Sequence, residues 1–230
     1  VQAGLQERDG RVYFVSGSPR DELWSTDGTP NGTVLEAALP DASILDSWQG
    51  PTVERLGGVL LVAMVSSDTG VPYLSAVDDD HPTRAEALGG FATGPDGRGW
   101  LARLGETVLF PLRTVGGGIA LGATEGSPGS TRILEDLCVG ECAFASGDPT
   151  KSPNGWLFDA TDAAGGRRLL EVGPDLEPRW RSQPFDKLQG AQEATPDAAE
   201  LEGALIFAAR DAHHGFEPFV SDPGSDAARL

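Results

Sequence analysis

Short apolar runs recur along the chain at a nearly constant interval. The third residue of each run falls at positions 14, 61, 110, 158 and 207, so the successive steps are 47, 49, 48 and 49 residues. A fixed step of this size is typical of one supersecondary unit copied along the chain. We therefore divide the single repeat domain, residues 1–230, into copies one to five, at approximately 1–47, 48–95, 96–145, 146–190 and 191–230. The runs are Val12-Tyr13-Phe14, Val59-Leu60-Leu61, Val108-Leu109-Phe110, Trp156-Leu157-Phe158 and Leu205-Ile206-Phe207.

Copy one shows what each unit contains. An apolar and aromatic run at 12–15 is followed by turn-forming residues, a second run holds Leu23 and Trp24, and a third begins at Thr33. Strands at intervals of roughly 8–12 residues, separated by Gly, Pro, Asn and Asp, predict an antiparallel meander. A fourth strand is expected ahead of the first run. In copies two and three that segment has a Leu directly before a Gly, at Leu56 and Leu104, and in copy five Leu201 comes two residues before Gly203.

These features predict an all-β fold, a five-bladed β-propeller with four-stranded antiparallel blades. Helical periodicity is confined to the short window 197–205, and 31 Gly and 17 Pro supply the turns. A ring packs every copy between two neighbours and leaves only short edges. We expect Trp24 to be buried between neighbouring blades, with Leu74 and Phe219 at matching sites. Gly122 takes that position in copy three, which predicts a small gap or different packing there.

A turn-rich signature follows the second strand of copy one. Its Asp27 carboxylate can accept hydrogen bonds from backbone amides two residues on. Residues 22–33 read ELWSTDGTPNGT and resemble the signature of the bacterial ELWxxDGT repeat proteins. Copies two and four depart from this pattern, but three other segments resemble it: 126–137 (GSPGSTRILEDL), 203–211 (GALIFAARD) and 217–222 (EPFVSD). The resemblance implies a β-propeller-like array in an exported bacterial protein, which is periplasmic, cell-surface or extracellular. It implies no activity, because the family is defined by its repeat.

The charge of the chain excludes some partners. The formal net charge is −18 and the sequence pI is near 4.4. Phosphate backbones need positive surface, so nucleic-acid binding is not expected, and an anionic membrane would repel the chain. The sequence contains no run of 18 apolar residues, so it predicts no membrane-spanning helix. The chain has no initiating Met, and its last residues align with the interior of a strand. We therefore expect it to be a segment of a longer exported protein.

The two cysteines, Cys138 and Cys142, lie four residues apart across a Gly. This spacing favours a small structural disulfide, with free thiols as the alternative. Zinc usually takes four ligands, so two Cys without a nearby His are a poor zinc site. A disulfide would indicate an oxidising compartment, in agreement with the export that the resemblance implies.

Acidic residues supply the candidate chemistry. Asp159 lies inside the apolar run of copy four, where it would be a catalytic acid if it pointed into a central channel and a surface residue if it pointed outward. A glycosidase needs two carboxyl groups converging on one pocket. Asp78, Asp79 and Asp80 offer the hard oxygen ligands that calcium takes, without the spacing of an EF-hand. No other cofactor is expected. The three histidines, His81, His213 and His214, lie in polar turns.

Taken together, these observations predict a non-catalytic binding or assembly module of an exported bacterial protein. Its partner is expected to be a protein or a larger assembly, and a glycan is compatible with the fold. Two alternatives remain. One is a propeller glycoside hydrolase with acidic channel residues. The other is an open repeat array that is completed by another chain.

Overall fold

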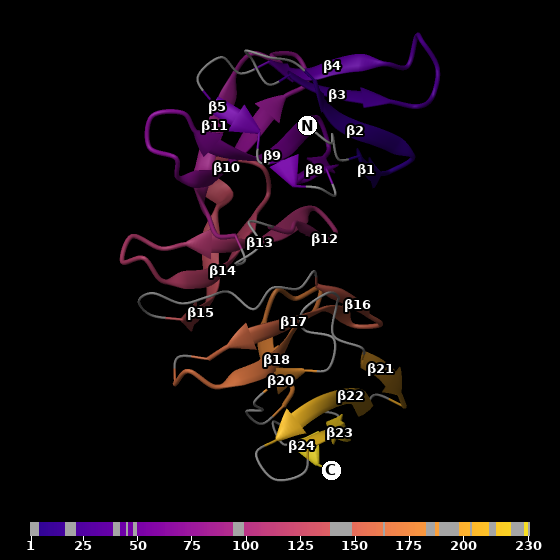
Figure 1. Cartoon of the computed structure of the whole chain (residues 1–230), viewed down its shortest axis with the longest axis vertical. Helices are drawn as coiled ribbons and strands as arrows, with labels where there is room; N and C mark the ends of the chain where they lie inside the picture. The colour runs from indigo at the N-terminus through magenta and orange to yellow at the C-terminus, as the bar shows by residue number, and fades with distance from the viewer. Residues whose placement is uncertain are drawn as a thin grey trace. The chain divides into compact units, whose positions relative to one another are not determined.

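The structure, a computed structural model, consists of antiparallel β-sheets (Figure 1). The described residues are 5–16, 22–38, 42–44, 46–47, 50–93, 99–138, 149–162, 164–182, 187–188, 198–202, 204–211, 215–221 and 228–229. Among them there is no α-helix, and the one helical turn is the 3-10 segment Pro128–Ser130. None of the helical structure in these ranges could cross a membrane. The all-β prediction is confirmed.

The chain divides into two compact units. The first comprises Val1–Thr93, Gly97–Arg113 and Gly122–Arg132, and the second Gly94–Asp96, Thr114–Leu121 and Ile133–Leu230. Copies one and two lie almost wholly in the first unit, and copies four and five lie in the second.

Copies one and four are the predicted four-stranded meanders. In copy one, the strands β1 (Leu5–Arg8), β2 (Arg11–Ser16), β3 (Glu22–Thr26) and β4 (Val34–Ala38) pair in chain order. In copy four, the same order holds for β16 (Thr150–Ser152), β17 (Gly155–Thr161), β18 (Arg167–Val172) and β19 (Pro178–Trp180).

Copies two and five have the same meander with a first strand in two pieces. Copy two contains β8 (Val53–Leu56), β9 (Val59–Ser66), β10 (Pro72–Asp78) and β11 (Ala85–Phe91), and β5 (Ala42–Ile44) pairs with the far end of β9. Copy five contains β21 (Ala198–Leu201), β22 (Ala204–Asp211), β23 (Gly215–Ser221) and β24 (Ala228–Arg229), and β20 (Lys187–Leu188) pairs with the far end of β22. The short strands β6 (Asp46–Ser47) and β7 (Gly50–Pro51) pair between β5 and β8.

Copies two and three are joined by backbone pairing. Copy three has β12 (Ala102–Leu104), β13 (Thr107–Arg113), β14 (Ile119–Thr124) and β15 (Arg132–Cys138). The end of β11 pairs with the end of β13, with Gly90 opposite Arg113. A Cβ on Gly90 would lie 3.0 Å from the Arg113 carbonyl oxygen, so glycine permits this approach. Sheets that run from copy to copy differ from the separate blades that the sequence predicts.

A two-residue hairpin between the first two strands marks the repeat in all five copies. The residues that close it on the first-strand side are Arg8, Leu56, Leu104, Ser152 and Leu201, at steps of 48, 48, 48 and 49. This register corrects the sequence alignment of copy two by one residue. The run equivalent to Val12-Tyr13-Phe14 is Leu60-Leu61-Val62, and not Val59-Leu60-Leu61.

The corrected alignment gives every copy two faces. We call the side that carries the second residue of the run the back face (Tyr13, Leu61, Leu109, Leu157, Ile206). The side that carries the third residue is the front face (Phe14, Val62, Phe110, Phe158, Phe207). Because strand side chains alternate, the whole meander follows this division.

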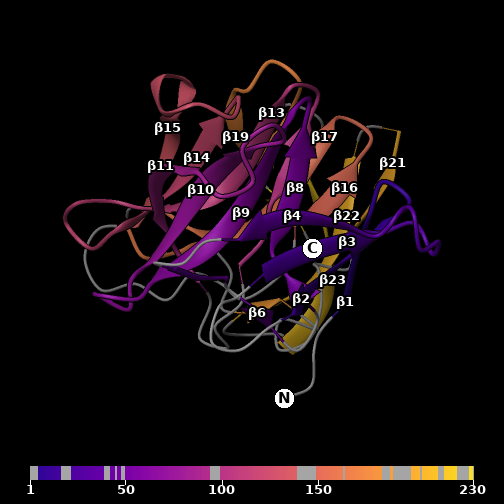
Figure 2. The ribbon, with the colours of Figure 1, turned by 90° about the horizontal axis from the view of Figure 1, so that it is seen from above.

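Back face packs on front face in the first unit. One core cluster joins Tyr13 and Leu23, on the back of copy one, to Leu60, Val62 and Met64, on the front of copy two. A second joins Leu61, Ala63 and Leu74, on the back of copy two, to Val108 and Phe110, on the front of copy three. Figure 2 shows the strands of copies one to three that carry these clusters.

The prediction for Trp24 is wrong. Leu23 is fully buried, whereas Trp24 lies on the front face, is only half-buried and pairs with Phe14. In copy two the residue opposite the third residue of the run is Ser75, which pairs with Val62, and not Leu74, because the hairpin of copy two is longer. The site matched by Gly122 holds no gap, since a Cβ there would lie 3.0 Å from both the Phe110 ring and the Leu112 side chain.

Candidate functional site

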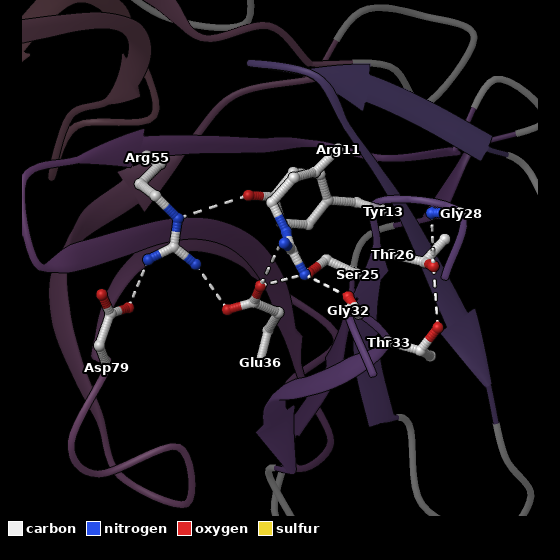
Figure 3. A network of polar contacts seen from close by, with 10 residues as sticks. All are labelled: Arg11, Tyr13, Ser25, Thr26, Gly28, Gly32, Thr33, Glu36, Arg55 and Asp79. Carbon is white, nitrogen blue, oxygen red and sulfur yellow. Dashed lines mark hydrogen bonds and ion pairs between the residues drawn. The ribbon is translucent and has the colours of Figure 1, made fainter. Parts of the chain in front are cut away.

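A cluster of polar side chains lies where copy one meets copy two (Figure 3). Arg55, on the front face of copy two, reaches three groups. Its Nη2 lies 2.5 Å from Glu36 Oε2, its Nη1 lies 2.5 Å from Asp79 Oδ1, and its Nε donates to the Tyr13 hydroxyl at 3.4 Å. The Glu36 side chain is 9% exposed, so its charge is largely removed from water and compensated by the guanidinium. We call this set of contacts the Arg55 junction.

A second arginine extends the cluster within copy one. Arg11 Nε donates to Ser25 Oγ at 2.9 Å, and its Nη2 donates to the Gly32 carbonyl at 2.7 Å. The buried Ser25 hydroxyl in turn donates to Glu36. The signature turn is therefore tied to the junction through Arg11.

The signature turn is organised by its own aspartate. Asp27 Oδ1 accepts from the Thr29 amide at 2.9 Å and from the Thr29 hydroxyl at 2.7 Å. These hydrogen bonds lower the pKa of the Asp27 carboxyl. Gly28 has a φ of 91°, and a Cβ on Gly32 would lie 1.9 Å from Asp27 Oδ1. The predicted turn role of Asp27 is confirmed. Its carboxylate is occupied by the hydrogen bonds from Thr29.

Copy three uses different chemistry for the equivalent turn. Here the Ser130 hydroxyl accepts from the amides of Glu125 and Ser127, at 3.0 and 3.2 Å. The Glu125 carboxylate lies 3.9 Å from Arg132 instead of closing the turn.

The arginine of the junction recurs one period later. Arg103, at the position in copy three equivalent to Arg55, donates from Nη1 to the Arg55 carbonyl at 3.0 Å. Both arginines therefore connect a copy to the one before it. Arg103 also lies 3.9 Å from the carboxylates of Asp9 and Glu106.

Asp159 is engaged by a base. Its side chain is only 8% exposed and forms an ion pair with Arg167 on the neighbouring strand, with Arg167 Nε 3.3 Å from Asp159 Oδ1. Burial raises the pKa of the Asp159 carboxyl, against the opposing effect of Arg167. The ion pair with Arg167 explains why an aspartate can lie in an apolar run. A second carboxylate is not needed for this explanation.

A buried carboxylate that sequence reasoning missed lies in copy four. Glu171 accepts from the Ser152 hydroxyl at 2.9 Å and forms an ion pair with Arg181, and both charged residues are buried. The signal in the sequence was the charged residue in the run Leu169-Leu170-Glu171-Val172. Arg55 and Glu36 were also missed, although Arg55 and Arg103 stand one period apart.

The calcium candidates do not converge. Asp78 Oδ1 accepts from the Asp80 amide at 2.9 Å, and Asp79 belongs to the Arg55 junction. Within the described ranges, no three His, Cys, Asp or Glu residues are grouped to hold a metal ion. His81 is exposed and lies 3.6 Å from Asp78. Cys142, the Cys138 side chain, His213 and His214 lie outside the described residues, so the disulfide stays a prediction.

Comparison with known proteins supports the fold. No family model and no curated protein matches the chain. Among solved structures, it is similar to a puromycin hydrolase (18% identity, TM-score 0.51, covering 90% of this chain and 32% of that one). It is also similar to a puromycin-hydrolyzing peptidase of Mycobacterium tuberculosis, at 15% identity with a TM-score of 0.51, over 100% of this chain and 38% of that one. TolB from Acinetobacter baumannii matches at 11% identity with a TM-score of 0.46, over 96% of this chain and 53% of that one.

The chain spans between about a third and a half of the length of these structures. At such identities the likeness concerns the fold alone. Together with the antiparallel meanders, the likeness to the puromycin hydrolase and the puromycin-hydrolyzing peptidase shows that this chain has a β-propeller-like all-β fold.

Proposed function

We propose that this chain is a non-catalytic binding or assembly module, built from five propeller blades of the ELWxxDGT type, in an exported bacterial protein. The observation that carries the proposal is the engagement of its buried carboxylates. Glu36 faces Arg55, Asp159 faces Arg167 and Glu171 faces Arg181. An acid–base pair for glycoside hydrolysis needs two carboxyl groups that share a pocket and have different protonation states. Carboxylates held by arginines instead stabilise the structure, between copies one and two for Glu36 and within copy four for Asp159 and Glu171.

The signature turn supports the same proposal. The contacts of Asp27, Thr29 and Gly32 account for the DGTPNG segment as a structural turn. The signature therefore specifies how a blade is built. What the module does then depends on the surfaces that the blades present, and a surface rich in acid favours a cationic or neutral partner over nucleic acid.

The decisive experiment is a turnover assay on the whole chain, with arabinan, galactan and mannan oligosaccharides and with peptide substrates. We expect no product above a heat-denatured blank. Turnover that Asp159→Asn abolishes, while the melting temperature is retained, would overturn the proposal in favour of the glycoside hydrolase. Arg179→Gln, at an exposed ion pair with Asp175, is the matched control and should change neither readout.

A further inference from the structure

Asparagine occurs only twice in the sequence, at Asn31 and Asn154, and both times a glycine follows it. In an Asn-Gly pair the backbone amide of the glycine can attack the side-chain amide of the asparagine, because glycine has no side chain to obstruct the approach. Asn31 is an exposed residue of the signature turn. Whether it reacts in the folded chain therefore depends on the state of the Gly32 amide.

The reaction is an intramolecular acyl transfer. The Gly32 nitrogen forms a bond to the side-chain carbonyl carbon of Asn31 and gives up its proton. The side-chain nitrogen leaves with that proton as ammonia, and a succinimide ring remains. Water then opens the ring at either carbonyl and gives aspartate or isoaspartate. Since the Gly32 amide must lose its proton, any group that holds this proton slows the first step.

The proton of the Gly32 amide is held twice in the signature turn. The amide donates to the Thr29 carbonyl at 3.2 Å and to the Thr29 hydroxyl oxygen at 3.0 Å. The same hydroxyl donates its own proton to Asp27 Oδ1 at 2.7 Å. A hydroxyl that donates to a carboxylate becomes a better acceptor, because hydrogen bonds in a chain polarise one another. Asp27 therefore strengthens the bond that keeps the Gly32 nitrogen protonated.

The charge of Asp27 acts in the same direction. A Cβ on Gly32 would lie 1.9 Å from Asp27 Oδ1, so the carboxylate lies directly beside the Gly32 backbone. The Gly32 nitrogen becomes negative as it loses its proton, and the attacked carbonyl oxygen of Asn31 becomes an oxyanion. A neighbouring negative charge disfavours both. All of these groups belong to the turn itself.

We propose that Asn31 is a site of spontaneous deamidation, and that the hydrogen-bond chain from Gly32 through Thr29 to Asp27 sets its rate. The folded turn reacts when it opens locally, and a local opening at an exposed turn costs less free energy than unfolding of the whole chain. The modification goes beyond the proposed function, because it requires no partner.

The isoaspartate product changes the contacts of the Arg55 junction. Isoaspartate routes the main chain through the former side chain, so it lengthens the backbone ahead of Gly32 by a methylene group. The Gly32 carbonyl, which accepts from Arg11 Nη2 at 2.7 Å (Figure 3), is then displaced. Arg11 also donates to Ser25, whose hydroxyl donates to Glu36. Deamidation therefore weakens the link between the signature turn and the junction.

Incubation of the full chain at pH 8, followed by proteolysis and mass spectrometry of the peptides, measures the rate at each asparagine. We expect Asn31 to react at least about tenfold more slowly in the folded chain than in urea, because the turn must open first. Asp27→Ala should raise the rate in the folded chain about two- to tenfold, the range that the net contribution of a hydrogen bond gives. Thr29→Val, which removes the hydroxyl, should act likewise. Asp175→Ala removes an acceptor from another exposed turn and should leave the Asn31 rate unchanged.

Asn154 provides an internal reference in every sample. Its rate should not respond to Asp27→Ala or Thr29→Val, because it lies in another copy. Equal acceleration at both asparagines would show that global unfolding governs the reaction, and equal Asn31 rates in the wild type and both variants would show that the turn has no influence. Either result would overturn the proposal.

Thermal unfolding tests the effect on the junction. The isoaspartate form, separated by ion-exchange chromatography, should melt at a lower temperature than fresh protein. This difference should shrink in Arg11→Met, which lacks the donor to Gly32. Asn31→Asp adds the charge without the methylene group and should lower the melting temperature less. An isoaspartate form that melts like fresh protein would overturn the effect on the junction.

Discussion

Gly32 and Asp27 form a pair in which the missing side chain of one makes room for the carboxylate of the other. The buried acidic side chains Glu36, Asp159 and Glu171 are likewise engaged, each by an arginine. At the scale of single residues, the chemistry of this chain is therefore directed at its own backbone and side chains. The sequence could predict the Asp27 turn because all of its partners lie within a few residues. It could not predict the pairing of Glu36 with Arg55, because the partners are 19 residues apart and belong to different copies.

Replacing Gly32 should destabilise the signature turn. In Gly32→Ala the new Cβ would overlap the Asp27 carboxylate, so the hydrogen bonds to Thr29 would be lost. We expect the free energy of unfolding to fall by about 1 to 3 kcal/mol, measured by urea denaturation. Gly129→Ala is the control, since a Cβ there meets nothing within 4 Å. Equal stability of the two variants would contradict this account of the turn.

Asp159 should make stability depend on pH in a defined direction. Burial raises the pKa of its carboxyl above the ordinary value of an aspartate. A carboxyl whose pKa is raised by folding stabilises the fold fully below its unfolded pKa, and this contribution disappears as pH rises through the folded pKa. The stability of the wild type relative to Asp159→Asn should therefore be highest in acid and fall as the pH rises above about 4. Thermal unfolding of both proteins between pH 3 and 7 measures it; a difference that grows with pH would show that Arg167 outweighs burial.

Elements are held in register by their turns more than by their apolar pattern. Seven consecutive residues of β9, from Val59 to Val65, are apolar, and both faces of the strand are buried, so alternation carries no information about its phase. The sequence alignment therefore slipped by one residue there, while the hairpin at Gly57-Gly58 fixes the true register. Trp24 was misplaced for a related reason. The size of its side chain suggested burial, but the strand phase places Leu23 inward.

The Arg55 junction should contribute measurably to the packing of copy one on copy two. Arg55→Met leaves the mostly buried Glu36 carboxylate without its closest cation. Breaking a buried pair costs about 3–5 kcal/mol. Arg55 and Asp79 are partly exposed and screened by solvent, so we expect about 2–3 kcal/mol here. Arg84→Met, at an exposed position of the same copy, should change stability by less than about 0.5 kcal/mol. Similar urea midpoints for the two variants would mean that the junction contributes little.

Coupling within the junction can be measured separately. A double-mutant cycle of Arg55→Met with Glu36→Gln should give an interaction energy of about 1 kcal/mol or more. Additive effects would show that the contact has no net influence on stability.

On the scale of the whole molecule, the repeat period, the all-β class and the four-stranded meander could all be predicted from the sequence. They depend on local turns and strand lengths, which recur five times and reinforce one another. The backbone pairing of β11 with β13 could not, because it depends on a single close approach at Gly90. The number of blades around an axis likewise depends on contacts between copies, about which each copy alone says nothing.

The redox state of the two cysteines bears on the oxidising compartment that is expected for the whole protein. We predict that Cys138 and Cys142 are bonded to each other. Because the loop is short, the stabilisation should stay below the roughly 3 kcal/mol of a 15-residue loop. Mass spectrometry of native protein under non-reducing conditions should find a mass two hydrogens below that of the dithiol. Two free thiols would contradict the prediction and remove its support for an oxidising compartment.

The Arg55 junction also has a consequence for how such a chain could be rearranged. Arg55 fits the back of copy one, where Tyr13 and Glu36 receive it, and would face Ile206 and Val220 if copy two followed copy five. The five units share a length and a hairpin but are not interchangeable parts. The side chains at each junction determine which unit can pack next to which. A gene in which the units were shuffled would encode the same blades, yet it would place a guanidinium against an apolar wall.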